Sequence, residues 1–158
     1  MVKIGIGYDA HRFVKGRPLI IGGVAVPFER GLEGHSDADV LLHAVGDAVL
    51  GAIGMGDIGM HFPDTDPRYK NISSLRILEQ IQGMARSRSF RCCNVDAVLV
   101  AQEPKLAAYR EEMQEHIARC LGVEPSAVNV KATTTEGMGF EGRCEGIAAH
   151  AVVLMEPF

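Results

Sequence analysis

Hydrophobic and polar residues alternate at the start of the chain, over the run Val2-Lys3-Ile4-Gly5-Ile6. Such alternation is typical of a β-strand, in which successive side chains point to opposite faces. The pattern predicts a first strand from about Val2 to Asp9. Because Asp9 and His11 are two residues apart, they would project side by side at the end of this strand. One oxygen and one nitrogen ligand on a rigid edge make two-thirds of a catalytic zinc site.

Further along the chain, the pattern predicts a hairpin, three helices and three more strands. Gly22 and Gly23 suit the turn of the hairpin, and Ser36 is a candidate N-cap with Asp39 three residues on. Pro104 suits the first turn of the third helix, and Gly122 its end. The predicted elements are hairpin strands over 19–21 and 24–26, helices over 36–53, 74–88 and 104–122, a loop over 54–67, and strands within 90–102 and over 128–133 and 147–155.

This order of elements predicts an α/β fold of the α+β sandwich kind, with a small mixed β-sheet and helices packed on one face. No internal repeat, low-complexity segment or linker rich in Pro or Ser interrupts the 158 residues. We therefore expect one domain over residues 1–158.

Composition and charge exclude several classes of function. Hydrophobic residues make up 47% and charged residues 23%, as in ordinary globular proteins. A net charge of -4 without a Lys/Arg cluster argues against nucleic-acid binding. No apolar run approaches the roughly 20 residues of a membrane helix. The four cysteines form no C-x-x-C pair, so we expect reduced, mostly buried thiols. With no signal or transit pattern at the start, a cytoplasmic location is expected.

The first predicted helix supplies a third candidate ligand, His43. Asp39, His43 and Asp47 lie one turn apart, opposite the apolar side of that helix. Asp39 is placed to orient the His43 ring, as carboxylates do for metal-bound histidines. A lone histidine here is more often solvated or partner-facing, but together with Asp9 and His11 the metal interpretation is favoured. Three ligands leave the fourth zinc position open, while Mn²⁺, Fe²⁺ and Co²⁺ also suit these ligands.

Polar residues in other segments add candidates for substrate binding. Segment 56–67 holds three carboxylates and two prolines, which either make Asx-type turns or grip substrate hydroxyls. The run Thr133-Thr134-Thr135-Glu136, followed by glycines, can hold phosphates directly and through a hard divalent ion. Lys105 lies at a strand-to-helix junction, within reach of a phosphate or nucleotide. His35 either contacts substrate at a helix N-terminus or is simply a polar flanking residue.

Taken in order, these motifs make the chain resemble the 2-C-methyl-D-erythritol 2,4-cyclodiphosphate synthase family. The matching blocks span nearly the whole chain and include Gly7-Tyr8-Asp9-Ala10-His11, His35-Ser36-Asp37-Ala38-Asp39 with His43, and Phe62-Pro63-Asp64-Thr65-Asp66-Pro67. The resemblance implies conversion of 4-diphosphocytidyl-2-C-methyl-D-erythritol 2-phosphate to the cyclic diphosphate with release of CMP, in non-mevalonate isoprenoid biosynthesis. It also implies a bacterial cytoplasmic homotrimer with active sites between adjacent subunits.

The resemblance further implies roles for individual residues. Asp9, His11 and His43 would hold one zinc per subunit, and Glu136 would lie near a second divalent ion, Mg²⁺ or Mn²⁺. His35 and Thr134 would be catalytic. Phe140 and Arg143 match residues near the trimer axis, where some members bind an isoprenoid diphosphate. The implied substrate-binding residues are Asp9, Ala10, His11, His35, Ser36, Asp57, Ile58, Gly59, Phe62, Pro63, Asp64, Thr65, Asp66, Ala101, Gln102, Glu103, Pro104, Lys105, Leu106, Ala107, Thr133, Thr134, Thr135, Glu136, Phe140 and Arg143.

Two other functions compete with the cyclase. A zinc-dependent phosphodiesterase would use the same ligands to activate water, and would add solvent oxygen to its product. A trimeric binding module with a structural metal needs a fourth protein ligand, and none is apparent. The cyclase needs no general base, because its nucleophile is a phosphate monoester whose second pKa is about 6. The chain correspondingly shows no Ser/His/Asp or Cys/His constellation.

Overall fold

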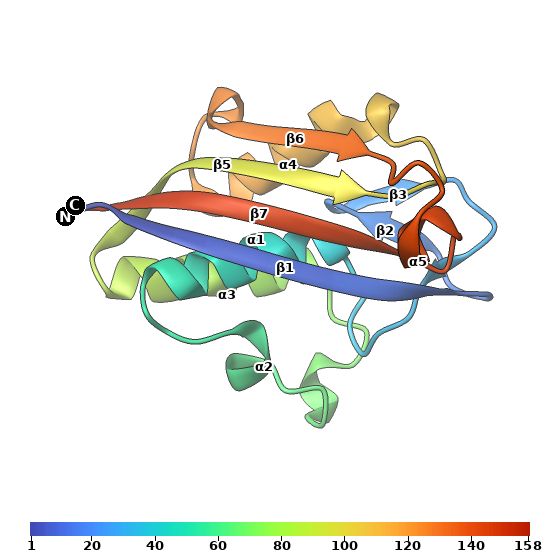
Figure 1. The fold of residues 1–158 in the computed structure, drawn as a ribbon. Coiled ribbons are helices and arrows are strands. Elements are labelled where there is room, and N and C mark those ends of the chain that lie inside the picture. Colours follow the sequence, from blue (N-terminus) through green and yellow to red (C-terminus); the bar gives the residue numbers. More distant parts are fainter.

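The computed structural model describes all residues, 1–158, and is built on a five-stranded mixed sheet (Figure 1). The strands lie in the order β4-β1-β7-β5-β6, and only the pair β5 and β6 is parallel. A two-stranded sheet joins β2 to β3. The bounds are β1 Lys3–Val14, β2 Leu19–Ile21, β3 Val24–Val26, β4 Gly31–Leu32, β5 Phe90–Val100, β6 Val128–Thr133 and β7 Gly146–Pro157. The predicted mixed sheet is confirmed.

Three long helices cover one face of the sheet, as predicted: α1 (Val40–Ala52), α3 (Ser74–Ser87) and α4 (Arg110–Leu121) (Figure 1). No helix has both the length and the apolar character needed to cross a membrane. Short helical turns occupy the connections, and two of them fall in or at the end of the segment predicted as a loop. These short elements are α2 Ile58–His61, η1 Pro67–Tyr69, η2 Ala107–Tyr109, η3 Pro125–Ala127 and α5 Gly139–Gly142.

β1 is longer than its hydrophobic pattern predicted. Its pairing with β7 continues in register from Lys3 opposite Met155 to Arg12 opposite Gly146. Asp9 and His11 therefore lie within the strand and not at its end, because the pairing with β7 extends beyond the segment in which hydrophobic and polar residues alternate. The predicted shared face is confirmed, since Asp9 and His11 follow the buried Gly5 and Gly7 on the side toward α1.

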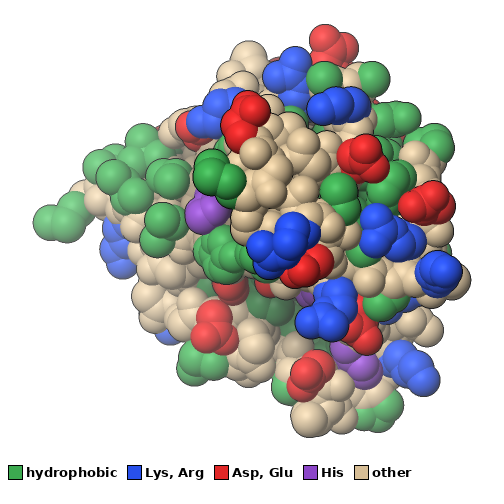
Figure 2. All heavy atoms as spheres, turned by 45° about the vertical axis from the view of Figure 1, so that its right-hand side comes forward, with side chains coloured by type: hydrophobic (Ala, Val, Ile, Leu, Met, Phe, Trp, Pro, Cys, Tyr) green, Lys and Arg blue, Asp and Glu red, His purple; other side chains and the backbone are tan.

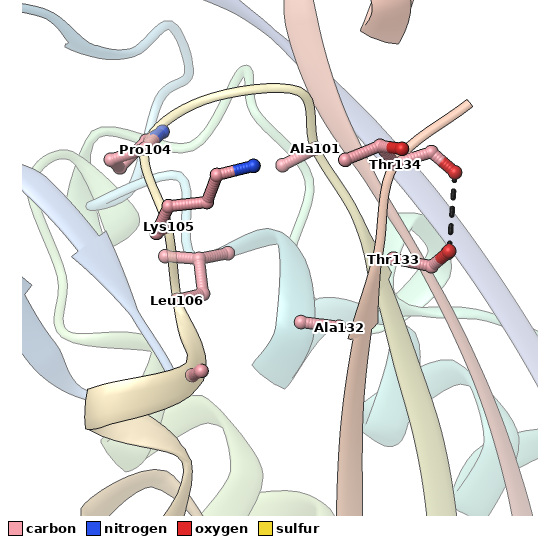
Figure 3. A pocket seen from close by; sticks show the side chains of 8 residues that line it. Ala101, Pro104, Lys105, Leu106, Ala132, Thr133 and Thr134 are labelled. Atoms are coloured by element: carbon pink, nitrogen blue, oxygen red, sulfur yellow. Dashed lines mark hydrogen bonds between the residues drawn. The ribbon is translucent and has the colours of Figure 1, made fainter. Parts of the chain in front are cut away.

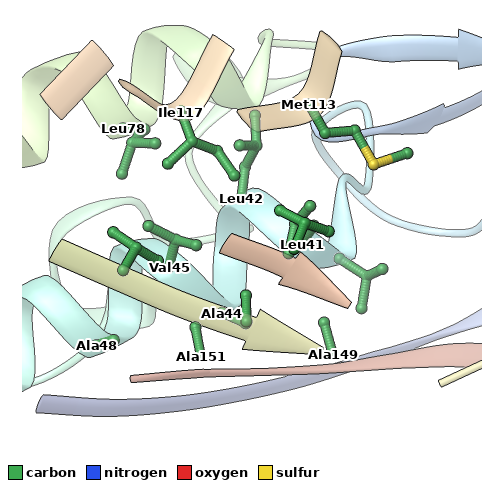
Figure 4. Packing of buried hydrophobic residues seen from close by; sticks show 14 of the residues in the cluster. Leu41, Leu42, Ala44, Val45, Ala48, Leu78, Met113, Ile117, Ala149 and Ala151 are labelled. Carbon is green, nitrogen blue, oxygen red and sulfur yellow. The ribbon is translucent and has the colours of Figure 1, made fainter. Parts of the chain in front are cut away.

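Two glycines of β1 let α1 lie directly on the sheet. A Cβ added to Gly7 would lie 1.8 Å from the carbonyl oxygen of Ala44, and one added to Gly5 would lie 1.8 Å from that of Ala48. These neighbours are backbone atoms, so no rotamer change would make room. Small residues continue the contact along β7, where Ala149 and Ala151 face α1 (Figure 4). The helix axis is thereby held close to both central strands.

α1 is buried on almost every side, whereas the sequence predicted one buried side. Its outer surface packs under α3 and α4, where Leu42 lies near Leu78 and Ile117 (Figure 4). His43 and Asp47 stay partly exposed. The hydrophobic pattern alone did not show that a second helical layer covers the outer side.

Asp39, and not Ser36, caps α1. Its fully buried carboxylate accepts from the N–H groups of Leu42 (3.1 Å), Gly22 (2.9 Å) and Gly23 (2.7 Å). Burial, together with the charge of Asp37, raises the pKa of Asp39 to about 6, against the lowering effect of these N–H groups. The predicted orientation of the His43 ring by Asp39 is wrong, because its oxygens bind the hairpin turn and the helix end instead.

The hairpin turn itself has the predicted form, since Gly22 and Gly23 both adopt positive φ, 59° and 73°. The third long helix begins later than predicted: Pro104 lies in a loop, and α4 starts only at Arg110. It ends where predicted, at Gly122 in the left-handed conformation.

We expect Gly7→Ala to lower the free energy of unfolding by about 3 kcal/mol or more, because the new methyl group overlaps the backbone of α1. The matched control is Gly83→Ala in α3, where an added Cβ meets no atom within 4 Å. The control should be neutral or stabilising by up to about 1 kcal/mol. Urea unfolding monitored by circular dichroism measures both. Equal stabilities of the two variants would contradict the proposed close contact.

Candidate functional site

Asp9 and His11 on β1 and His43 on α1 converge on one point. Oδ2 of Asp9 lies 2.8 Å from Nε2 of His11 and 3.0 Å from Nδ1 of His43, and these two nitrogens are 3.2 Å apart. Tetrahedral zinc with bonds of about 2.0–2.1 Å sets neighbouring ligand atoms roughly 3.3 Å apart. The three atoms therefore form a triangle of the size that a zinc ion requires. The structure thus brings the predicted ligands together. They form the one group of three or more His, Cys, Asp or Glu side chains that lie close enough to hold a metal ion.

The His11 ring is held from its outer side. Its Nδ1 lies 2.7 Å from the backbone carbonyl of Glu33, which can only accept a hydrogen bond. Nδ1 therefore carries the proton of the neutral ring, so Nε2 would present its lone pair to an ion bound beside Asp9 and His43. A backbone carbonyl in this position is a frequent partner of metal-bound histidines.

The electrostatics of the group favour an ionised carboxylate. Burial alone would raise the pKa of Asp9, but hydrogen bonds and charge from His11 and His43 outweigh it and lower the pKa to about 2. Burial would lower the pKa of His11, yet Asp9 raises it above its ordinary value. Asp9 is thus an anion at neutral pH, as a ligand for a divalent cation must be.

Two cavities open beside Asp9, His11 and His43. Most of the residues between 9 and 66 that were predicted to bind substrate border one or both of them. One, of about 220 Å³, is bordered by His11, Gly34, His35, Ser36, His43, Ile58, Phe62, Asp64, Tyr69 and Ile77. The other, of about 430 Å³, is bordered by Asp9, His11, His43, Asp47, Ile58, Gly59, Phe62, Pro63 and Asp64. His35, Ser36 and segment 58–64 therefore adjoin the ligand triangle.

The three carboxylates of segment 56–67 were expected either to make Asx-type turns or to bind substrate hydroxyls, and the structure shows that they differ in this respect. Asp57 caps α2 by accepting from the N–H of Met60, and Asp66 caps η1 and pairs with Arg68. Both thus make Asx-type turns. Asp64 borders both cavities instead and is free to accept from a ligand hydroxyl. Thr65 borders neither cavity.

A third cavity, of about 330 Å³, lies between the loop after β5 and the end of β6 (Figure 3). Lys105 extends from that loop toward the strand end that carries Thr133 and Thr134 (Figure 3). Gln102 and Glu103 do not border it; the Gln102 side chain accepts from the N–H of Gly137 (3.2 Å) and ties the two loops together. The bordering residues are Ala101, Pro104, Lys105, Leu106, Ala107, Ala132, Thr133 and Thr134.

Within one chain, the third cavity and the ligand triangle stay apart. Ala10, Ala148, Val100 and Thr133 form one row across the sheet. Three strand spacings of about 4.8 Å separate the ends of this row, roughly 14 Å in all. The predicted catalytic Thr134 and the predicted metal ligand Glu136 belong to the far side, so one chain does not bring them to Asp9, His11 and His43.

Phe140 belongs to α5, and it borders a shallow cavity of about 240 Å³ with Ala10, His11 and Glu145. Arg143 follows α5 and is exposed, with its guanidinium paired to Glu145 at 3.0 Å. Thr135 donates to the carbonyl of Met138 and shapes the loop before α5.

Sequence reasoning missed residues that act through contacts distant in the chain. The Arg17 guanidinium donates to the carbonyls of Gly34 and Ser36 and so holds the chain on both sides of His35. Asp47 accepts from the N–H of Ile58 (2.8 Å) and anchors α2 beside the triangle. Only Asp47 had a sequence signal, because it lies one turn after His43.

Comparisons with known proteins agree on one family. The model of the YgbB family matches residues 2–156. A curated protein of Geobacillus kaustophilus, 2-C-methyl-D-erythritol 2,4-cyclodiphosphate synthase, is 62% identical over 156 residues, covering 99% of both chains.

Two solved structures are similar throughout this chain. The bifunctional IspDF of Campylobacter jejuni superposes with a TM-score of 0.96 at 44% identity; the match covers 100% of this chain, which spans 43% of that longer one. IspF of Plasmodium falciparum, solved as a CDP complex, superposes with a TM-score of 0.86 at 30% identity, covering 99% of this chain and 96% of that one.

We expect His43→Ala to weaken zinc binding by more than about 100-fold, since loss of a ligand exceeds the effect of losing an outer hydrogen-bond partner. The matched control is His61→Ala, because His61 donates to the carbonyl of Met55 (2.7 Å) and lies outside the triangle. Titration of metal-free protein with zinc by calorimetry measures both. Unchanged affinity in His43→Ala would remove this histidine from the ligand set.

Proposed function

The chain belongs to the YgbB family, in which its curated relatives are 2-C-methyl-D-erythritol 2,4-cyclodiphosphate synthases, and we propose that it catalyses the reaction of that name. The substrate is 4-diphosphocytidyl-2-C-methyl-D-erythritol 2-phosphate, and the products are the 2,4-cyclodiphosphate and CMP. The observation that carries the proposal is the convergence of Asp9, His11 and His43 beside cavities bordered by the other matching motifs.

The donor set fits a zinc ion in composition and in size. One carboxylate and two imidazole nitrogens form the triangle described above, and no fourth protein ligand closes it. When bound there, zinc would supply a Lewis acid that polarises phosphoryl oxygens. Asp9, His11 and His43 would hold the ion, and the same three residues border a cavity together with Asp64 and Gly59.

The reaction forms one P–O bond and breaks another. An oxygen of the 2-phosphate attacks the β-phosphorus, the bond from that phosphorus to the CMP oxygen breaks, and CMP leaves with the bonding electrons. The attacking phosphate is largely dianionic near neutral pH, so no residue needs to remove a proton. The remaining demands are positioning and charge stabilisation. His35 and Ser36 border the cavity beside the triangle and would support the transferring group.

The leaving cytidine phosphate is assigned to the third cavity. Its walls are apolar apart from Lys105 and the threonine hydroxyls, which suits a base with a phosphate at one end. Lys105 and a second divalent ion near Glu136, Mg²⁺ or Mn²⁺, would neutralise the leaving group. Thr134 would act at the phosphate from this side. The CDP complex of the Plasmodium falciparum relative supports a cytidine site in this fold.

A homotrimer with active sites between subunits would bring the ligand triangle of one subunit together with the third cavity of another. Two features support it. The ligand triangle and the third cavity stand apart within one chain, and a neighbouring subunit would bring a second copy of each region close to the other. The sheet face opposite the helices also exposes Ile4 and Ile6, each 71% accessible, beside Tyr8 and Val152. Hydrophobic side chains gather on the side of the molecule where both termini lie (Figure 2), and such exposed apolar surfaces are typical of interfaces.

Three further assignments complete the proposal. Residues 1–158 act as one catalytic domain. Phe140 and Arg143 would contact an isoprenoid diphosphate at the trimer axis; Phe140 borders a cavity, and Arg143 would offer a cation to the phosphates. The enzyme works in the bacterial cytoplasm, and its four free cysteines support a reducing compartment.

Of the four cysteines, only Cys92 is buried, so the prediction of mostly buried thiols is wrong for the other three.

Incubation with the diphosphocytidyl substrate, zinc and Mg²⁺ should release CMP and the cyclic diphosphate in equal amounts. Chromatography with mass spectrometry detects both products. Running the assay in ¹⁸O-labelled water distinguishes the cyclase from a phosphodiesterase, because only hydrolysis adds solvent oxygen. A linear, ¹⁸O-labelled product would overturn the cyclase assignment.

Glu136→Gln should raise the Mg²⁺ concentration needed for half-maximal turnover by about tenfold or more, since a neutral amide binds a hard cation less well. Zinc content, measured by atomic absorption, should stay unchanged. Glu141→Gln in α5 is the matched control and should leave the Mg²⁺ response as it is. The same Mg²⁺ response in both variants would remove Glu136 from the second metal site.

Ile6→Glu should convert trimers to monomers, because a charge on the exposed sheet face opposes association. Light scattering after size-exclusion chromatography gives the mass, and circular dichroism should show an unchanged fold. Met60→Glu, on α2 and equally exposed at 71%, is the control and should remain trimeric. A trimeric Ile6→Glu protein would place the interface elsewhere.

A further inference from the structure

The second nitrogen of the His43 ring faces two serine hydroxyls. Nε2 lies 2.9 Å from Oγ of Ser74 and 3.2 Å from Oγ of Ser36. Ser74 is the first residue of α3 and is 1% exposed, so water does not compete for its hydroxyl. Neither serine is a metal ligand. The protonation of Nε2 nevertheless decides what Nδ1, on the opposite side of the ring, offers to a metal.

The Ser74 hydroxyl has its proton already committed. It donates to Oδ1 of Asp37 in a short hydrogen bond, and Oδ2 of Asp37 accepts from the backbone N–H of the same serine (3.0 Å). A hydroxyl carries one proton, so toward His43 the Ser74 oxygen can act only as an acceptor. Nε2 must then carry the ring proton, which leaves the lone pair on Nδ1, where Asp9 and His11 lie.

The Ser36 hydroxyl is the weaker partner of Nε2. Its oxygen accepts from the N–H of Ala38 (3.1 Å) and lies farther from the ring than that of Ser74. Its own proton has no acceptor committed to it. With Nε2 donating, this proton is free to be donated into the cavity that Ser36 borders, where phosphoryl oxygens are expected.

The backbone is shaped to hold Asp37 in this position. Ala38 has a φ of 58°, a left-handed conformation that residues other than glycine rarely adopt. The carboxylates of Asp37 and Asp39, on either side of Ala38, therefore serve different elements: Asp37 binds the start of α3, and Asp39 binds the hairpin turn and α1. This arrangement joins the three elements around His43.

We propose that Asp37 and Ser74 are positioning residues that fix the tautomer and orientation of His43, through the chain Asp37–Ser74–His43, so that Nδ1 is presented to the metal. The inference rests on the proposed role of His43 as a metal ligand. Outer partners of this kind typically change metal affinity by about 10- to 100-fold.

The test compares Ser74→Ala with Ser73→Ala. Both delete one serine hydroxyl at the start of α3, but the Ser73 hydroxyl makes no capping hydrogen bond. Competition with a chromophoric chelator measures the zinc Kd of the metal-free proteins. We expect the Kd to rise about 10- to 100-fold in Ser74→Ala and to remain near the wild-type value in Ser73→Ala. In the zinc-loaded proteins, the His43 Nε2–H resonance should exchange faster with solvent in Ser74→Ala alone.

Asp37→Asn provides a second, isosteric variant if Ser74→Ala does not fold. The new amide N–H can donate to Oγ of Ser74, which turns the hydroxyl proton toward Nε2 and opposes the metal-binding tautomer. Zinc affinity should therefore fall at least as far as in Ser74→Ala. Wild-type affinity in the folded variant overturns the proposal, as does wild-type affinity in a folded Ser74→Ala. Wild-type protein that binds no zinc and forms no cyclic product would instead overturn the proposed function itself.

Discussion

The close contact between α1 and β1 is the constraint on which the rest of the structure depends. Gly5 and Gly7 have no Cβ, so the backbone of α1 lies against the strand at Ala44 and Ala48. The same two elements carry the ligand triangle, with Asp9 and His11 two and four residues after Gly7 and His43 one residue before Ala44. A side chain at Gly7 would move the helix by more than the tolerance of a metal site, which accepts ligand distances within about 0.2 Å.

Polar contacts then fix the helix along its axis. Asp39 joins the start of α1 to the hairpin turn, while Asp37 joins the same segment to the start of α3. Buried N–H groups left without an acceptor destabilise a fold by about 1–3 kcal/mol each, so these carboxylates strongly favour one arrangement. Arg17 holds the carbonyls on either side of His35 in the same way. Rigidity at the site thus comes from residues that touch neither substrate nor metal in the proposed reaction.

The open face of the sheet and the divided site have a common explanation in the proposed assembly. Helices cover one face only, and the opposite face presents Ile4, Ile6 and Val152. A row of residues across the sheet separates the two substrate regions by roughly 14 Å. Association through the open face would bury apolar surface and, in the same step, bring the cytidine cavity of one chain toward the ligand triangle of another. Folding stability and catalytic competence would then depend on one interface.

The sequence by itself determined the fold class, most helices and strands, the hairpin turn and the three members of the ligand triangle. These features follow from periodicity and turn chemistry, which act between near neighbours: Asp9 and His11 share a face because strands repeat every two residues. The motifs also sufficed to identify the family, which the comparisons confirm.

Tertiary structure alone decided which polar residues serve the site and which serve the fold. Asp39 was expected at the His43 ring but caps α1, whereas Ser74, 31 residues away from His43, meets that ring. Of the carboxylates in segment 56–67, only Asp64 borders the cavities beside the triangle. The composition of a short segment cannot show such differences. A carboxylate binds whichever donors the packed chain places beside it, and those donors come from elements distant in sequence.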